Sequence, residues 1–165
     1  MLKIAICDDD LGELSQISGL LNQYKAEKEP AFQYDAFSNA IELLDAMKRK
    51  DYYILFLDVL MPGLNGIEAA QEIRAFNEEI KIIFLTSSKE FAVESYAVDA
   101  HYYMLKPGTS EKLFPILDKI FLDARRGEDT LQIKTAAGFT RIPFGKIEFL
   151  EVFSKKLRFH LVDGT

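Results

Sequence analysis

The residues of this sequence best suited to chemistry stand directly after short apolar runs. Asp8 and Asp9 follow the first run, Asp58 follows the third, and Thr86 and Lys106 follow the fourth and fifth. If these runs are parallel strands of one sheet, all five side chains meet at its carboxyl edge, where open α/β sheets bind their ligands. Three carboxylates, a hydroxyl and an ammonium group would then converge on one place.

Such a convergence predicts a particular chemistry. Carboxylates that lie close together repel one another and raise at least one pKa, and a divalent cation relieves this repulsion. Mg²⁺ prefers oxygen ligands and commonly binds to one or two carboxylates together with phosphate oxygens. Lys106 and Thr86 could bind the remaining oxygens of a phosphoryl group. Asp58 would then be an in-line nucleophile, and the expected chemistry is formation and loss of an aspartyl phosphate.

The strands that would carry these residues are predicted by apolar runs rich in Ile, Phe and Tyr. They are residues 2–7, 32–37, 53–57, 81–85 and 102–105. Between the runs, apolar residues recur at helical spacing, as at Leu14, Ile17, Leu21 and Tyr24. Alternating strands and helices predict an α/β fold in which helices cover both faces of a parallel sheet.

Three helix starts are indicated by a capping residue followed three positions later by Glu. Asp10, Asn65 and Ser87 are the capping candidates. After residue 126 the helical period gives way to alternation, with strands expected at 131–135, 147–153 and 157–162 and a turn at Ala137-Gly138. Residues 127–165 are therefore expected to form a second, all-β unit.

Four motifs of the first 126 residues together resemble the receiver domain of response regulators. They are Ile4-Ala5-Ile6-Cys7-Asp8-Asp9-Asp10, Phe56-Leu57-Asp58-Val59-Leu60-Met61-Pro62-Gly63-Leu64-Asn65-Gly66, Leu85-Thr86-Ser87 and Tyr103-Met104-Leu105-Lys106-Pro107. The resemblance implies a doubly wound, flavodoxin-like sheet of five parallel strands in the order 2-1-3-4-5. It also implies a two-component signalling protein that receives a phosphoryl group from a sensor histidine kinase, and not an enzyme with its own substrate.

The same resemblance assigns roles to individual residues. Asp58 would be the phosphoacceptor, and Asp8, Asp9 and Asp58 would hold Mg²⁺ together with the backbone carbonyl of Leu60. The matching positions also give Thr86 and Lys106 contact with the phosphoryl group, make the Lys106–Pro107 bond cis, and make Thr86 and Tyr103 the switch pair.

Residues 127–165 resemble the opening strands of a LytTR DNA-binding domain, through Leu131-x-Ile133-x-Thr135, Ile147-x-Phe149-Leu150-Glu151 and Leu157-x-Phe159-x-Leu161. That family needs roughly 100 residues, so a partial, truncated output domain is expected. DNA is then a partner of the complete protein, and sequence-specific DNA binding by this chain alone is not expected. The apolar strands favour pairing with a second chain, and a homodimer is expected.

Composition sets the remaining expectations. The 165 residues carry 20 Lys and Arg against 26 Asp and Glu, with no apolar segment long enough to span a membrane. Cys7 is the sole cysteine and is expected to be a buried, unreactive thiol. A cytoplasmic protein with no membrane partner is expected. The alternative is a Mg²⁺-dependent haloacid-dehalogenase-like phosphohydrolase, since Asp8-Asp9-Asp10 satisfies its D-x-D motif, although that interpretation leaves Asp58 without a role.

Overall fold

In the computed structural model, residues 1–128, 130–135, 138–143, 146–153 and 156–162 are described. Five parallel strands form one sheet in the order β2-β1-β3-β4-β5, as expected. They are β1 (Leu2–Cys7), β2 (Phe32–Phe37), β3 (Ile54–Leu57), β4 (Lys81–Thr86) and β5 (Tyr102–Leu105). Three of the predicted strands have the observed bounds, whereas β3 begins one residue later and β4 ends one residue later than predicted.

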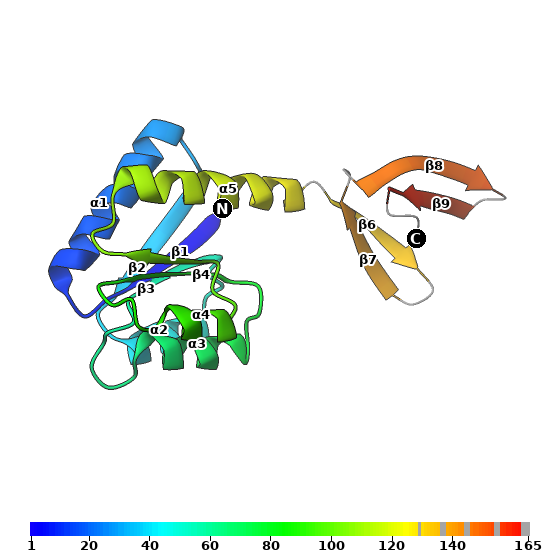
Figure 1. Cartoon of the computed structure of the whole chain (residues 1–165). Helices are drawn as coiled ribbons and strands as arrows, with labels where there is room; N and C mark the ends of the chain where they lie inside the picture. Colours follow the sequence, from blue (N-terminus) through cyan, green and yellow to red (C-terminus); the bar gives the residue numbers. More distant parts are fainter. Residues whose placement is uncertain (129, 136–137, 144–145, 154–155, 163–165) are drawn as a thin grey trace. The chain divides into compact units, whose positions relative to one another are not determined.

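Five helices connect these strands and follow them. They are α1 (Leu11–Lys28), α2 (Ala40–Met47), α3 (Gly66–Arg74), α4 (Ala92–Ala97) and α5 (Ser110–Glu128). Figure 1 shows α1 on one face of the sheet and α2, α3 and α4 on the other. Such two-sided cover follows from right-handed crossovers between parallel strands, and the doubly wound α/β fold is thereby confirmed.

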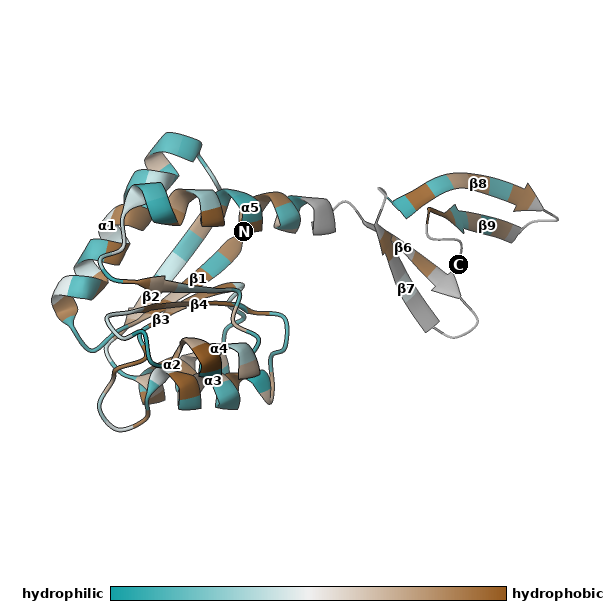
Figure 2. Cartoon of the chain, in the orientation of Figure 1, coloured by the Kyte–Doolittle hydropathy of each residue, from teal (hydrophilic) through white to brown (hydrophobic). Residues whose placement is uncertain are grey.

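The core is built from the strands and from one side of each helix. Figure 2 shows hydrophobic residues along the strands and in stripes on the helices. The predicted α1 stripe of Leu14, Ile17, Leu21 and Tyr24 is buried, each residue at most 8% exposed. On the opposite face, α2 and α3 contribute Leu43, Ala70 and Ile73, which are fully buried, to the main cluster. Burial on both faces explains why the strands are apolar runs without alternation.

Two of the three predicted helix starts are confirmed. Asp10 accepts hydrogen bonds from the backbone N–H groups of Gly12 and Glu13, and Asn65 forms a complete capping box with Glu68. The prediction at Ser87 is wrong, because α4 begins at Ala92 with no side-chain cap. There the Oγ of Ser88 accepts from the backbone N–H of Glu90 at 3.1 Å, which makes a local turn.

The chain divides into two compact units, Met1–Leu113 and Phe114–Thr165. In the second unit α5 continues to Glu128, so the predicted domain boundary after residue 126 falls inside a helix and remains a prediction. Two antiparallel pairs follow: β6 (Thr130–Thr135) with β7 (Gly138–Pro143), and β8 (Ile147–Phe153) with β9 (Lys156–Leu161). Ala137 of the predicted turn lies outside the described residues.

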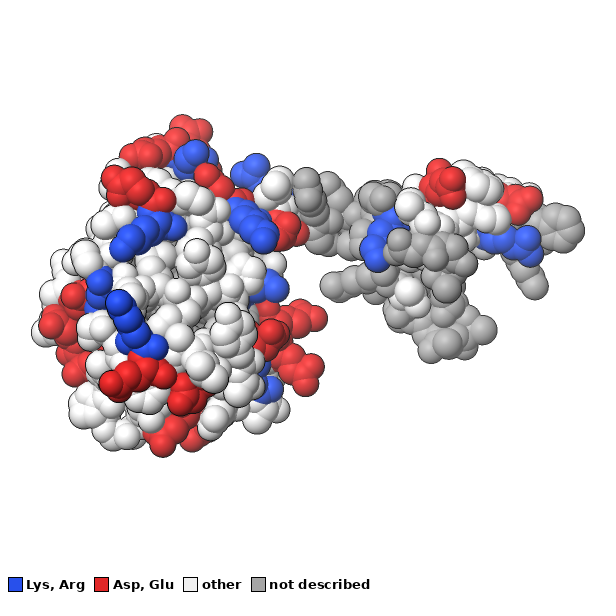
Figure 3. Space-filling model, in the orientation of Figure 1, with Lys and Arg blue, Asp and Glu red and all other residues white. Residues whose placement is uncertain are grey.

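The charge and hydropathy of the chain agree with the expectations from its composition. Among the described residues, no helix has the length and apolarity needed to cross a bilayer. On the face of the first unit visible in Figure 3, acidic and basic side chains are interspersed with broad uncharged areas. That distribution agrees with the 14 basic and 21 acidic residues of positions 1–126, which do not favour a nucleic-acid surface there.

Candidate functional site

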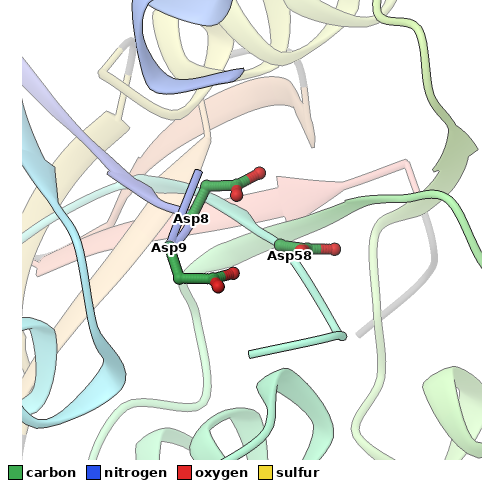
Figure 4. A group of neighbouring side chains, drawn as sticks. All are labelled: Asp8, Asp9 and Asp58. Carbon is green, nitrogen blue, oxygen red and sulfur yellow. The ribbon is translucent and has the colours of Figure 1, made fainter. Parts of the chain in front are cut away.

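Three carboxylates gather where β1 and β3 end. Asp8 and Asp58 are each 5% exposed, and Asp9 is exposed. One oxygen from each of the three lies within 4.8 Å of the others. Figure 4 shows the side chains extending from the two strand ends into a common space. The predicted convergence of Asp8, Asp9 and Asp58 is therefore observed.

Strand register brings these residues together. Cys7 of β1 pairs with Leu57 of β3, so the residues that follow them, Asp8 and Asp58, leave the sheet side by side. The backbone N–H of Asp58 donates to the carbonyl of Cys7 at 2.9 Å, which extends the ladder by one residue. Because hydrogen bonds hold the backbone at the end of each strand, the direction in which each carboxylate leaves the sheet is fixed.

Lys106, the residue directly after β5, extends its side chain to the acidic cluster. Its Nζ lies 2.6 Å from Asp8 Oδ2 and 3.5 Å from Asp58 Oδ2. Its backbone N–H donates to the carbonyl of Thr86 at 2.9 Å, and the peptide bond from Lys106 to Pro107 is cis, as the resemblance implied. The ammonium group therefore lies between two buried carboxylates.

Burial and charge shift the titration of these groups. Burial raises the pKa of Asp8, against the opposing hydrogen bonds from Lys106 and from the backbone N–H of Asp10. Burial lowers the pKa of Lys106, but its hydrogen bond to Asp8 and the charges of Asp58, Asp8 and Glu13 outweigh this, so the net shift is upward. Lys106 is thus held as a cation inside an acidic cluster.

The neighbouring Cys7 behaves as the sequence predicted. Its side chain is 1% exposed and its Sγ lies 3.6 Å from Met61 Sδ. Burial, together with the charges of Asp8 and Asp58, raises the pKa of Cys7 to about 12. A thiol so shifted is a core residue and not a nucleophile.

Thr86 and Tyr103 lie beyond the cluster on β4 and β5. Thr86 is fully buried, and its Oγ1 accepts from the backbone N–H of Ser88 at 3.4 Å. The half-buried Tyr103 donates its hydroxyl hydrogen to the carbonyl oxygen of Ser88 at 2.7 Å. Its ring lies 6.0 Å from that of Phe84. The segment after Thr86 is therefore tied to Tyr103.

The acidic cluster fits a divalent cation. Asp58 Oδ1 is buried and has no hydrogen-bond partner among the described residues, which is costly for a charged oxygen. A cation bound by Asp8, Asp9 and Asp58 would satisfy it and offset the repulsion between the three groups. The Leu60 carbonyl, expected as a further ligand, follows Asp58 by two residues, and its role remains a prediction.

Residues 4–118 match the family model described as "Response regulator receiver domain". This chain belongs to the response regulator receiver family. Receivers are signalling proteins, so the phosphohydrolase alternative is set aside. The expected response regulator receiver domain is thereby confirmed.

Curated relatives extend the comparison. The receiver is 30% identical to the transcriptional regulatory protein LytR of Staphylococcus aureus over 119 residues, which are 72% of this chain and 47% of LytR. It is 28% identical to an uncharacterized response regulatory protein of Yersinia pestis over 172 aligned residues, covering all of this chain and 70% of that protein. The chain spans about half the length of most of the curated relatives it matches, such as 43% of protein MrkE of Klebsiella pneumoniae.

Solved structures share the fold. The response regulatory domain of MrkE from Klebsiella pneumoniae superposes with a TM-score of 0.68 at 26% identity, covering 75% of this chain and 98% of that domain. The response regulator TrrA of Thermotoga maritima, solved in complex with Mg²⁺ and beryllofluoride, has a TM-score of 0.59 at 30% identity, covering 73% and 99%.

The structure adds Gly66 to the residues that shape the site. A Cβ atom at this position would overlap the carbonyl oxygen of Asp58 and lie 2.8 Å from the Cα of Val59. The backbone N–H of Gly66 also donates to the carbonyl of Val59 at 3.0 Å. Glycine at the first position of a helix, where other residues are better helix formers, was the sequence signal that could have identified it.

Proposed function

We propose that this receiver accepts a phosphoryl group on Asp58 from a sensor histidine kinase and signals through the resulting change of conformation. The observation that carries the proposal concerns the carboxylate of the buried Asp58. Its Oδ1 has no hydrogen-bond partner among the described residues, and its Oδ2 lies 3.5 Å from Lys106 Nζ. In the transfer, a carboxylate oxygen of Asp58 attacks the phosphorus atom while the bond from phosphorus to the donor histidine nitrogen breaks. The electron pair of that bond remains on the histidine.

Asp8, Asp9 and Asp58, with the Leu60 carbonyl, would hold Mg²⁺. When bound, the ion offsets the negative charge that the phosphoryl oxygens bring to an acidic site. Support comes from the three carboxylates, whose oxygens lie within 4.8 Å of one another. Lys106 would move from Asp8 toward a phosphoryl oxygen, since both groups compete for the same ammonium hydrogens.

Thr86 and Tyr103 would transmit the phosphorylation state. A phosphoryl group on Asp58 adds acceptor oxygens that the Thr86 hydroxyl can bind. Such a movement of Thr86 would alter the space next to Tyr103, whose hydroxyl is bonded to the Ser88 carbonyl. The segment between Ser88 and Tyr102 would then change its stability or position, which is how a local charge becomes a readable surface.

The test of this function is direct phosphorylation. The purified chain would be incubated with Mg²⁺ and acetyl phosphate and its intact mass measured. Wild type should gain one phosphoryl group that hydroxylamine removes, because hydroxylamine cleaves acyl phosphates. Asp58→Asn should gain none, and a wild-type sample without Mg²⁺ should gain little. Equal labelling of the Asn variant would refute the assignment of Asp58.

We also propose that residues 127–165 are part of a LytTR-type output domain, through which the complete protein would bind DNA and regulate transcription. Support comes from the strands of residues 130–161 and from the relative LytR, which is a transcriptional regulatory protein. On this proposal residues 127–165 are the opening strands of that domain and do not read base edges. A DNA-binding titration of the chain at physiological salt should detect no sequence-selective complex, and nanomolar selective binding would contradict this.

A homodimer is proposed as the assembly. In β8 and β9, cross-strand pairing places Leu150 and Val152 opposite Phe159 and Leu157 on one face of the hairpin. Leu150, Val152 and Leu157 are 51%, 74% and 62% exposed, which is unfavourable for an apolar face in water. Light scattering should give twice the chain mass, falling to the monomer when residues 127–165 are removed. A monomeric full chain would contradict the proposal.

A further inference from the structure

Helix α1 begins with a capping arrangement that is only half complete. At α3 the box is reciprocal: Glu68 N–H donates to Asn65 Oδ1 at 2.9 Å, and Asn65 N–H donates to Glu68 Oε2 at 3.0 Å. At α1, Glu13 N–H donates to Asp10 Oδ1 at 3.3 Å, but the N–H of Asp10 donates to Asp8 Oδ1 at 2.9 Å. Asp8 has therefore taken the N–H that the Glu13 carboxylate would otherwise bind.

The face of α1 that carries Glu13 packs against the loop after β5. Glu13, Gln16 and Ile17 are neighbours on one side of the helix because they are three and four residues apart. Gln16 Nε2 donates to the carbonyl of Gly108 at 2.9 Å, and a Cβ at Gly108 would lie 3.2 Å from Ile17 Cδ1. Gly108 follows Lys106 by two residues, so this hydrogen bond ties α1 to the loop that begins with Lys106. Glu13 lies one helical turn before Gln16 and is therefore close to the same loop.

The Glu13 side chain is half-buried at this place, and one of its carboxylate oxygens is enclosed. Its Oε2 has no hydrogen-bond partner in the part of the chain that the structure describes. Its negative charge is one of those that raise the pKa of Lys106, after the larger contributions of Asp8 and Asp58. An enclosed carboxylate oxygen without a partner is costly for a fold, which favours a role in the site over a role in stability.

We propose that Glu13 is a positioning residue of the phosphorylation site, a fourth carboxylate that retains Lys106 and disfavours a phosphoryl group on Asp58. This inference rests on the proposed function of Asp58. Glu13 acts through Lys106, because the ammonium group must leave its carboxylate partners to bind a phosphoryl oxygen. It also adds negative charge to a site where phosphorylation places more.

The negative charge of Glu13 should affect the binding of cations and of anions in opposite directions. An additional negative charge favours Mg²⁺ and disfavours a phosphoryl group or its mimic. Neutralising Glu13 should therefore weaken Mg²⁺ binding and, at saturating Mg²⁺, strengthen beryllofluoride binding. A purely structural role of Glu13 would change both affinities in the same direction, because a disordered site binds neither ligand well.

The experiment compares Glu13→Gln with Glu27→Gln, which removes the same charge from the far end of the same helix. Glu27 is exposed and accepts a hydrogen bond from Gln23 Nε2 at 2.8 Å. Titration calorimetry would measure the affinity for Mg²⁺ alone and for beryllofluoride at saturating Mg²⁺. Intact mass would measure labelling by acetyl phosphate. In Glu13→Gln, Mg²⁺ affinity should fall by about threefold or more and beryllofluoride affinity should rise by about threefold or more. Glu27→Gln should match wild type.

The failures are distinguishable. Wild type that is not labelled, or Asp58→Asn that is labelled as well as wild type, refutes the proposed function and the inference with it. Wild type labelled at Asp58 together with Glu13→Gln affinities equal to those of wild type refutes the inference alone. Loss of both affinities in Glu13→Gln also refutes it, and so does an equal effect of Glu27→Gln.

Discussion

The ammonium nitrogen of Lys106 lies 2.6 Å from Asp8 Oδ2, and both side chains are nearly enclosed, with exposed fractions of 13% and 7%. The carboxylate of Asp58 lies 3.5 Å from the same nitrogen. One cation that directly follows β5 therefore neutralises part of the charge of two acids that directly follow β1 and β3. The same contact makes the metal-free site dependent on Lys106.

Lys106→Met should accordingly destabilise the metal-free protein. Removing one partner of a buried ion pair leaves the other charge uncompensated, and a loss of about 2 kcal/mol or more in unfolding free energy is expected. Added Mg²⁺ should recover part of the loss, because it supplies positive charge to the same carboxylates. Urea unfolding with and without Mg²⁺ measures this, and Lys119→Met, at an exposed position of α5, is the control. Equal stability of the two variants would contradict the prediction.

Gly66→Ala tests the close approach of α3 to the strand end. Because a Cβ would overlap the Asp58 carbonyl, the loop that carries Asp58 must shift. We expect lower stability, by about 1–3 kcal/mol, and weaker Mg²⁺ binding. Gly19→Ala in α1, where a Cβ would meet no atom within 4 Å, should instead stabilise the protein by up to about 1 kcal/mol. Equal effects of the two substitutions would refute the explanation.

The sequence predicted the strands and the convergence of the acids because both depend on local apolar runs and on parallel order. It did not predict where α4 begins, because the same spacing of a capping residue and Glu occurs at Asp10, Asn65 and Ser87, and distant contacts decide whether a helix starts there. The pair Asn65 and Glu68 makes the full box, whereas Asp8 takes the backbone N–H of Asp10. The close contact at Gly66 likewise depends on how α3 meets the loop after β3, and the spacing of residues does not encode this.

Asp35 should give the fold a specific pH dependence. The Tyr52 hydroxyl and the Lys50 ammonium donate to its Oδ2 at 2.6 and 2.9 Å and hold the pKa of Asp35 below its usual value. The ionised group therefore stabilises the fold above the unfolded-state pKa of about 3.9, and this contribution is lost as the pH falls through the lower folded value. Tyr52→Phe should be less stable than wild type near pH 7, and the gap should narrow below about pH 4.

The control for this pH effect is Tyr34→Phe, on the same strand as Asp35. It removes a neutral hydrogen bond of 3.2 Å to Asn22 Oδ1, which has no charge that titrates in this range. Urea unfolding of both variants between about pH 3 and pH 7 provides the comparison. A stability gap for Tyr52→Phe that does not change with pH would show that the charge of Asp35 contributes nothing.

Tyr103→Phe should separate the chemistry of the site from its readout. The change removes the 2.7 Å hydrogen bond to the Ser88 carbonyl but leaves the carboxylates and Lys106 untouched. Loss of one such bond lowers the local opening free energy by about 1 kcal/mol, so amide exchange over residues 88–102 should be about fivefold faster. Labelling of Asp58 by acetyl phosphate should match wild type. Tyr102→Phe, at the half-exposed neighbouring position, is the control, and exchange as fast in that variant would show that the Ser88 bond does not hold the segment.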